Sequence, residues 1–299
     1  MLDLSEEWLW DAPVVLAATP IGNLADTTQR LRMLIRSAEV IACEDTRSTR
    51  HLINALGERT GARFVSLHEH NEAARSAELI SLAREGSRVL VVSDAGMPAV
   101  SDPGRRLVRA AIEAEVPVTA APGASAVPTA LALSGLATDR FTFAGFVPRR
   151  QSERRALLQR LRREEWTTVL FESPHRVAST VAEFAEALGG GRRAAVAREL
   201  TKKYEEVLRG ELSELADLLA ERHKGRGVRG EIVVVLDGAA PSDTGAQNTV
   251  TLQEAARAVV RRAAGGERLK EAAKEVAREH RMNASELYDA ANELRSTSG

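Results

Sequence analysis

Three loops that follow aliphatic runs carry residue types suited to holding a polar ligand. They read ATPIGNL (18–24), SDAGMPAVSDPG (93–104) and APGASAVP (121–128). In parallel α/β domains, ligands bind beyond the carboxyl ends of the strands, where loops and helix N-termini present unpaired backbone N–H groups. Each loop alone is more typical of an ordinary turn, because Asp, Gly and Pro are turn residues. Their occurrence together, on alternating strands, predicts a shared ligand site.

The same loops argue against two common nucleotide sites. None of them matches G-x-G-x-x-G, and none matches G-x-x-x-x-G-K-[ST]. A dinucleotide-dependent dehydrogenase and a P-loop nucleotidase are therefore disfavoured.

A second group of residues could move protons or bind metal. Acidic and histidine side chains occur in CEDTR (43–47), HEHNE (68–72) and ESPHR (172–176). Residues two apart point to opposite faces of a strand, and HEHNE is not H-E-x-x-H, so His68 and His70 do not form a zinc pair. We expect no metal site, with His68 facing the ligand cleft and His70 facing solvent.

The strongest local basic feature is PRRQSERRALLQRLRR (148–163), in which seven arginines accompany the single acid Glu153. Arginines recur there at helical spacing, so one helix face could follow an RNA backbone. The alternative is a solvated face paired with Glu164 and Glu165.

Hydrophobic patterning predicts the elements that position these residues. From Pro13 onward the runs VVLAAT, EVIAC, RFVSL, RVLVV and VPVTA alternate with helical segments such as 27–38 and 72–85. This alternation predicts a largely parallel sheet covered by helices. After residue 121 a second, mixed α/β domain is expected, with strands RFTFAGF, TTVLFES, RRAAVAREL, YEEVLRG and GEIVVVLDG and helices near 151–163, 174–187 and 211–222.

The last part of the chain predicts a small helical bundle. Helical patterns cover 251–264, 267–280 and 284–295, and Asn283 with Glu286 could cap the last of them. Such a bundle resembles a helix-turn-helix domain and suggests nucleic acid, but its balanced charge suits a structural or protein-contacting role equally well. The predicted divisions are a 1–12 extension, domains 13–121 and 122–237, a 238–249 linker and a 250–299 helical domain.

Composition narrows the class of protein. Among 299 residues, 41 basic side chains balance 42 acidic ones, so any nucleic-acid contact must be a local patch. The single cysteine, Cys43, excludes an intrachain disulfide and fits a reducing compartment. No apolar stretch reaches the ~18 residues of a membrane span. A cytoplasmic protein without membrane attachment is expected.

Eight motifs, in order, resemble the ribosomal RNA small subunit methyltransferase I family: ATPIGNL, CEDTR, LHEHNE, SDAGMPAVSDPG, PGASA, ESPHR, RELTKKYEEVLRG and GEIVVV. The resemblance runs from residue 13 to 237 and places the chain in the tetrapyrrole (corrin/porphyrin) methylase fold class. It implies two α/β domains with the cofactor cleft between them, a small C-terminal helical bundle and a homodimer.

The resemblance also implies a reaction, namely methyl transfer from S-adenosylmethionine to the ribose 2′-hydroxyl of a decoding-centre cytidine. The expected partner is 16S rRNA or the small ribosomal subunit. Enzymes that methylate tetrapyrroles typically open with V-G-x-G-P-G-D, whereas this chain has Ala18-Thr19-Pro20-Ile21-Gly22-Asn23, which favours the RNA branch. A methyltransferase for a tetrapyrrole or another small molecule, and a non-catalytic ribosome- or RNA-binding factor, remain the alternatives.

Site residues follow from the same resemblance. Cofactor contacts are expected at Pro20, Asp94, Ala95, Gly96, Met97, Val100, Ser125, Ala126, Phe171, Leu200 and Gly230. For Phe171 and Leu200 the alternative is packing at the domain junction. Asp102 is expected to cap the next helix, with Pro103 as its first residue.

The transfer needs no metal, but a general base should help it. Glu44 or Asp45 is expected to orient or deprotonate the hydroxyl, and His68, Glu69, Glu172 and His175 are further possible bases. For CEDTR the alternative is an acid–base turn that opens a helix. RNA contacts are expected at Arg47, Arg149, Arg150, Arg154 and Arg155.

Overall fold

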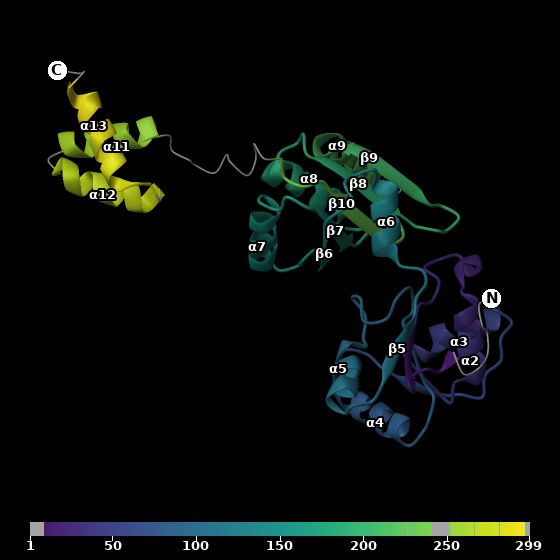
Figure 1. The fold of residues 1–299 in the computed structure, drawn as a ribbon. Helices are drawn as coiled ribbons and strands as arrows, with labels where there is room; N and C mark the ends of the chain where they lie inside the picture. Colours follow the sequence, from purple (N-terminus) through teal and green to yellow (C-terminus); the bar gives the residue numbers. More distant parts are fainter. Residues whose placement is uncertain (1–8, 226, 241–251, 266, 281, 297–299) are drawn as a thin grey trace. The chain divides into compact units, whose positions relative to one another are not determined.

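The computed structural model describes residues 9–225, 227–240, 252–265, 267–280 and 282–296. Most of the predicted 1–12 extension and of the 238–249 linker lies outside these residues. The chain divides into two compact units, Met1–Gly238 and Ala239–Gly299. Figure 1 shows the elements of both units, and each unit is described by itself below.

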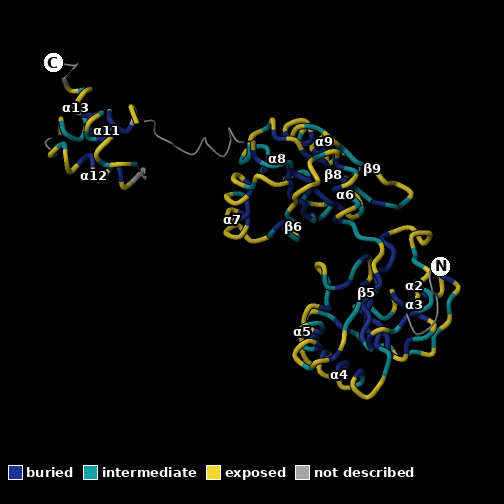
Figure 2. Tube along the Cα trace, viewed as in Figure 1, coloured by how far each residue is buried: buried dark blue, intermediate teal, exposed yellow. Residues whose placement is uncertain are grey.

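The first half of unit 1 contains a five-stranded parallel sheet in the order β3-β2-β4-β1-β5. Its strands are β1 (Val14–Ala17), β2 (Val40–Cys43), β3 (Arg63–Ser66), β4 (Val89–Val92) and β5 (Val118–Ala121). The central strands are apolar at every position because both faces of the sheet are covered. In Figure 2 this interior appears as buried trace around β5.

Helices cover the two faces of this sheet in pairs. They are α2 (Gln29–Ser37), α3 (Thr46–Ala55), α4 (Glu72–Arg84) and α5 (Arg105–Glu113), with a short 3-10 turn η1 (Leu24–Asp26). One buried cluster packs α2 and α3 against the sheet, through Leu34 and Ile53 among others. A separate cluster packs α4 and α5 on the opposite face, through Leu79 and Leu107. Helices therefore cover both faces of the sheet, and the carboxyl ends of its strands remain accessible to a ligand.

The second half of unit 1 contains a mixed five-stranded sheet in the order β6-β7-β10-β8-β9. Only the β6/β7 pair is parallel. The strands are β6 (Phe141–Phe146), β7 (Thr167–Glu172), β8 (Arg193–Arg198), β9 (Glu206–Glu211) and β10 (Ile232–Leu236). The helices are α6 (Ala126–Ser134), α7 (Gln151–Leu161), α8 (Val177–Leu188) and α9 (Leu212–Lys224).

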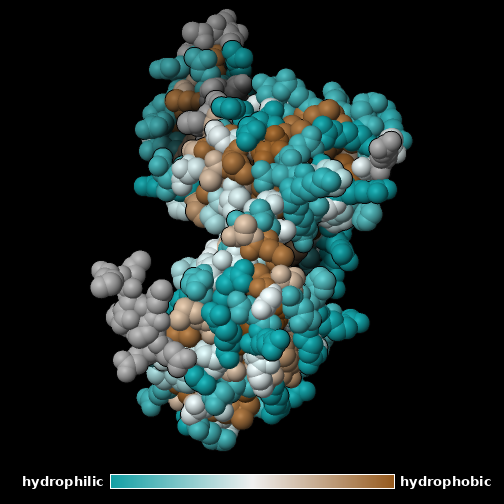
Figure 3. Space-filling model, turned by 90° about the vertical axis from the view of Figure 1, so that its right-hand side faces the viewer, coloured by the Kyte–Doolittle hydropathy of each residue, from teal (hydrophilic) through white to brown (hydrophobic). Residues whose placement is uncertain are grey.

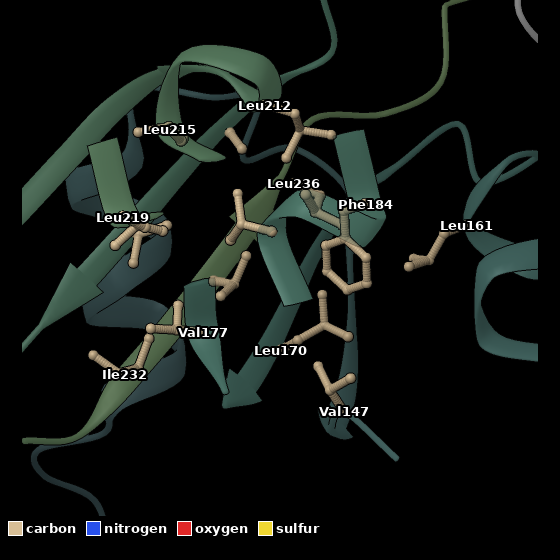
Figure 4. Close-up of a cluster of buried hydrophobic side chains, with 14 of the residues drawn as sticks. Val147, Leu161, Leu170, Val177, Phe184, Leu212, Leu215, Leu219, Ile232 and Leu236 are labelled. Atoms are coloured by element: carbon tan, nitrogen blue, oxygen red, sulfur yellow. The ribbon is translucent and has the colours of Figure 1, made fainter. Parts of the chain in front are cut away.

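The core of this second sheet is again built on both faces. Helices α7, α8 and α9 bury Leu161, Phe184 and Leu219 against one face, and Figure 4 shows these side chains gathered around β7 and β10. Helix α6 packs Val127 and Leu131 against the other face. The predicted strands and helices of unit 1 are confirmed, and the paired helices and sheets agree with the expected two-part α/β fold.

Unit 2 is a three-helix bundle of α11 (Leu252–Ala264), α12 (Leu269–His280) and α13 (Ala284–Ser296). Its core consists mainly of alanines around Val259, Val276 and Leu287. The side chain of Asn283 accepts hydrogen bonds from the backbone N–H groups of Ser285 and Glu286, at 2.9 and 3.5 Å. The predicted cap is therefore formed by the asparagine oxygen.

Hydrophilic residues cover most of the face shown in Figure 3, with apolar residues gathered in smaller patches. Among the described residues, no helix is both long enough and apolar enough to cross a bilayer.

Candidate active site

The loops singled out in the sequence meet at one edge of the parallel sheet. Ala17 of β1 lies in register with Val92 of β4 and Ala121 of β5, and Val92 is also paired with Cys43 of β2. The loops that follow these strands therefore begin side by side.

Backbone pairing continues beyond the strands and fixes two of these loops together. Thr19 and Gly96 exchange backbone hydrogen bonds of 2.9 and 3.1 Å. The hydroxyl of Thr19 donates to the carbonyl of Ser93 at 3.2 Å, and the hydroxyl of Ser93 donates to that of Gly96 at 2.9 Å. The loops after β1 and β4 thus form one rigid surface.

A cavity of about 560 Å³ opens at this surface, a size typical of small-molecule sites. Its walls come from the loops after β1, β2 and β4, from the start of α6 and from the ends of β6, β7 and β10. The lining residues are Ile21, Glu44, Asp94, Ala95, Gly96, Met97, Val100, Ser101, Asp102, Ser125, Ala126, Val127, Phe146, Phe171, Glu172, Ser173, Pro174, Gly230, Glu231, Ile232 and Val233.

Most of the predicted cofactor contacts lie in this wall. They are Asp94, Ala95, Gly96, Met97, Val100, Ser125, Ala126, Phe171 and Gly230. Pro20 and Leu200 are not among the residues that line the cavity, so the contacts expected of them stay predictions. Pro20 is buried, and its neighbour Ile21 supplies the wall instead; Leu200 packs in the core beneath, with Ile21 and Val127.

The two glycines of the wall are required for different reasons. Gly96 has a φ of +84°, and a Cβ there would lie 3.2 Å from Cγ2 of Ile21, so only glycine lets the loops approach this closely. Gly230 has a φ of +90°, but a Cβ there would collide with the side chain of Glu199. Glycine at position 230 is therefore required by its φ and by the packing of Glu199, and its backbone contact with the cofactor stays a prediction.

The N-terminus of α6 contributes backbone donors to the cavity. Ser125 is the N-cap residue, and within the described part of the chain its side chain makes no capping hydrogen bond. The first-turn residues Ala126 and Val127 both line the cavity. First-turn N–H groups have no intrahelical acceptor, so they suit the carboxylate or hydroxyl oxygens of a ligand.

The carboxyl groups of Glu44, Asp94 and Asp102 also line the cavity, and all three have raised pKa values. Burial and the nearby charge of Asp94 raise the pKa of Glu44, and burial raises the pKa of Asp94. Burial, reinforced by the charges of Glu44 and Asp94, raises the pKa of Asp102 to about 6. The cavity therefore disfavours further negative charge and favours a cation or a hydrogen-bond donor.

Asp102 does not cap the following helix, which corrects the prediction. Helix α5 begins at Arg105, two residues after Pro103, and its N-cap is Gly104. Buried Glu72, at the start of α4, accepts hydrogen bonds from the backbone N–H groups of Gly104 and Arg106 at 2.9 and 2.8 Å. Because Glu72 takes the capping role, the carboxyl of Asp102 is left to face the cavity.

The loop that carries Asp102 is conformationally strained. Ala99 and Ser101 have φ values of 68° and 64°, in the left-handed region that non-glycine residues rarely adopt. Their conformation is held by a hydrogen bond from the Ala99 N–H to the Pro103 carbonyl at 3.1 Å. Such strain is common where a loop presents groups to a ligand.

CEDTR separates into a cavity residue and a helix cap. Glu44 lines the cavity, whereas Asp45 does not. The side chain of Asp45 accepts a 2.8 Å hydrogen bond from the N–H of Arg47 and pairs with its guanidinium at 3.0 Å, which lowers the pKa of Asp45. The helix-opening alternative thus describes Asp45, and Arg47 lies exposed beside it.

The remaining possible bases lie outside the cavity or are fully engaged. His68 is half-buried and is not among the residues that line the cavity; His70 is exposed, as expected. The side chain of Glu172 is almost completely buried and accepts hydrogen bonds from Thr180 Oγ1 at 2.5 Å and from the Ser173 N–H at 2.7 Å. These partners fix the Glu172 side chain in a structural role.

The arginine-rich segment forms α7, but its arginines do not share one role. Arg154 is buried, forms an ion pair with Glu183 and donates to Thr180 Oγ1 at 3.0 Å, so it is not available to an RNA backbone. This corrects the prediction for Arg154. Arg149, Arg150 and Arg155 are exposed.

No group of three or more His, Cys, Asp or Glu side chains in the described part of the chain is arranged to hold a metal ion. Sequence reasoning did not identify Ile21, Phe146 or Glu231 as lining residues. It also gave Asp102 a different role. The roles of these four positions are visible only in the folded protein, because each depends on contacts with residues distant in sequence.

Comparison with known proteins gives consistent similarities. Residues 13–216 match the family model Tetrapyrrole (Corrin/Porphyrin) Methylases. The chain is 46% identical over 287 residues to the ribosomal RNA small subunit methyltransferase I of Mycobacterium tuberculosis (strain ATCC 25618 / H37Rv), and the match covers 96% of both chains. It is 39% identical over 279 residues to the protein of the same name from Synechocystis sp., covering 93% of this chain and 97% of the relative.

Solved structures share the fold at lower identity. Diphthine synthase superposes with a TM-score of 0.58 at 19% identity, covering 75% of this chain and 89% of that chain. Uroporphyrin-III C-methyl transferase from Thermus thermophilus, complexed with S-adenyl homocysteine, gives a TM-score of 0.51 at 20% identity, covering 75% and 96%.

The raised pKa of Asp102 predicts a pH-dependent stability effect. A pKa of about 6 in the folded protein, above the ordinary 3.8, means that folding favours the protonated form, so stability is lost as pH rises from 3.8 through about 6. Asp102→Asn is therefore expected to be more stable than the wild type at about pH 7 and nearly equal to it at about pH 3.5. Urea unfolding across this range checks the prediction, with the exposed Asp217→Asn as control. A difference that does not change with pH would contradict it.

Proposed function

Because the chain belongs to the ribosomal RNA small subunit methyltransferase I family, within the tetrapyrrole methylases, we propose that it methylates the ribose 2′-hydroxyl of a decoding-centre cytidine in 16S rRNA. The methyl donor of this family is S-adenosylmethionine. One observation carries the proposal: a single cavity collects most of the expected donor contacts together with ionisable groups that could receive a proton.

The walls of the cavity fit the donor's functional groups. S-adenosylmethionine combines a sulfonium, an ammonium and a carboxylate with an adenosine. The uncapped first turn of α6 suits the carboxylate or hydroxyl groups, and the carboxyls of Asp94 and Asp102 suit the positive groups. Apolar side chains such as Ile21 and Phe171 suit the adenosine.

We assign the general base to Glu44. When bound, the donor supplies an electrophilic methyl carbon, and the chain must align an oxygen with it and remove a proton. Glu44 lines the cavity, and its raised pKa strengthens it as a proton acceptor. Asp45 is held by Arg47 and lies outside the cavity wall, so it is the weaker assignment.

The RNA face is proposed on the exposed arginines of the 149–163 region. Arg149, Arg150 and Arg155 lie at or near the start of α7, directly after the strand β6 that ends at the cavity. They would contact phosphates and so position the RNA. A cytoplasmic homodimer, and domain limits at 13–121, 122–237 and 250–299, are part of the same proposal.

The activity is tested with labelled S-adenosylmethionine and small ribosomal subunits that lack the modification. Label is expected on one cytidine ribose, located by mass spectrometry. Ala95→Trp adds bulk to an exposed residue of the cavity wall and should abolish both transfer and donor binding in calorimetry. Ala182→Trp, on the exposed side of α8, is the matched control. Label on a porphyrin precursor, or tight ribosome binding without transfer, would contradict the proposal.

Glu44→Gln is expected to lower kcat by about 10²- to 10⁴-fold, the usual contribution of a general base. Donor affinity should change little, because the amide is isosteric. Asp45→Asn serves as the matched control: the asparagine oxygen can still cap α3, so both the melting temperature and kcat should be retained. Full turnover by Glu44→Gln at saturating substrate would remove Glu44 from the mechanism.

Arg155→Glu is expected to weaken binding to the small subunit. Each lost phosphate contact should also reduce the slope of log K against log salt by about one. Arg109→Glu makes the same charge change on an exposed arginine of α5 and should leave the slope unchanged. Identical salt slopes for the two variants would indicate that α7 does not contact RNA.

A further inference from the structure

Phe146 is a large aromatic residue that folding leaves exposed on the wall of the cavity. Its exposed fraction is 62%, although phenylalanine is normally buried. Its ring stands against that of Phe171 with centroids 5.2 Å apart, and Phe171 in turn contacts Phe143 at 5.0 Å. The end of β6 therefore presents one face of an aromatic cluster to whatever enters the cavity.

An irregularity in the sheet places the ring there. Successive residues of a strand point to opposite faces, so Phe143 and Phe146, three apart, would ordinarily lie on opposite sides. The register between β6 and β7 shifts between these two residues, and Gly145 has a φ of +70°. The shift puts both rings against Phe171. Bulges of this kind re-aim side chains next to binding sites.

A buried polar network holds this position. Beyond the ring, the Val147 N–H donates to the Phe171 carbonyl at 3.0 Å. Arg176 donates to the carbonyls of Val147 and Pro148 at 3.2 and 2.9 Å. Its guanidinium pairs at 3.3 Å with Glu172, whose side chain is 1% exposed. The ring is thus pre-organised, which reduces the entropy lost when a flat ligand stacks on it.

Charge around the cavity favours a nucleotide that enters base first. Glu44, Asp94 and Asp102 line the interior and would repel a phosphate. Exposed Arg149 and Arg150 follow Phe146 directly in the chain, outside the cavity wall. A phosphate is therefore favoured beside the arginines, while the uncharged base and ribose are accepted inside.

We propose that Phe146 is the platform on which the base of the acceptor nucleotide stacks, with its phosphates held outside by Arg149 and Arg150. The ligand class is an unpaired nucleotide of single-stranded RNA, because only a base free of its own stack can present a face to the ring. The proposal rests on the proposed RNA methyltransferase function. It adds to that function the residue, Phe146, that holds the acceptor base.

The test compares Phe146→Leu with Phe146→Trp and with Phe141→Leu, all in the full chain. Phe141 lies at the other end of β6, is 41% exposed and does not line the cavity, so it controls for the loss of an exposed ring. Phe146→Leu should lower kcat/KM for the ribosomal subunit by about 10- to 100-fold, as expected for one lost stacking contact. Phe146→Trp should retain the wild-type value, and Phe141→Leu should be unchanged.

Two further measurements separate the other partners that this ring could contact. Calorimetry should give the same donor affinity for Phe146→Leu and the wild type; a matching loss of donor affinity would assign the ring to the donor's adenine and overturn the proposal. Sedimentation should also be unchanged, since a change of oligomeric state would assign the ring to a contact between copies of the chain. Equal kcat/KM for Phe146→Leu and Phe141→Leu would likewise overturn the proposal.

Failure of the proposed function can be distinguished from failure of this inference. If the wild type transfers no methyl group to RNA, the proposed function falls. Equilibrium binding of a single-stranded RNA oligonucleotide then decides the role of the ring. Weaker binding by Phe146→Leu, restored in Phe146→Trp, would support stacking, and equal binding by all three proteins would overturn it.

Discussion

The common register of the parallel strands is the constraint on which the site depends. Ala17, Val92 and Ala121 lie side by side, so the loops that follow them share an origin. The reciprocal hydrogen bonds between Thr19 and Gly96 extend this order past the ends of the strands. Because helices cover both faces of the sheet, a ligand meets these backbones at the carboxyl ends of the strands. The pairing of the strands therefore determines where the cavity lies, before any side chain is considered.

Acidic residues of unit 1 fall into two groups according to the number of hydrogen-bond donors that surround them. Glu72 and Glu172 are nearly fully buried, yet each is matched by hydrogen-bond donors and by a nearby arginine. They stabilise loops and are not available to a substrate. Glu44 and Asp102 are less buried, but partial burial without matching donors among the described residues, reinforced by neighbouring carboxylates, raises their pKa values. Acidic residues therefore stabilise the fold in the first case. In the second case their negative charge has no ion-pair partner among the described residues of the cavity, where a cationic ligand would reduce the repulsion between the carboxylates.

The sequence predicted the elements well because each carries a local pattern. Buried strands such as β4 are short continuous aliphatic runs, and helices such as α2 carry apolar residues at helical spacing, so neither pattern depends on distant partners. The loops of the site were also recognisable as motifs. The errors concern long-range partners: the capping of α5 by Glu72, 32 positions before Gly104 in the chain, could not be read from SDPG. Spacing likewise showed that Arg154 lies on a helix, but not that α8 covers its side chain.

The burial of Arg154 connects the proposed RNA face with the cavity. Arg154 and Glu172 share Thr180 as a hydrogen-bond partner, since Arg154 donates to its hydroxyl and that hydroxyl donates to Glu172. Glu172 also pairs with Arg176, which holds the segment after Phe146. The network thus fixes which side of α7 faces the core and, as a consequence, which arginines face outward. One set of buried contacts orients both the basic surface of α7 and the aromatic rim of the cavity, so the two cannot shift independently without breaking a buried charge pair.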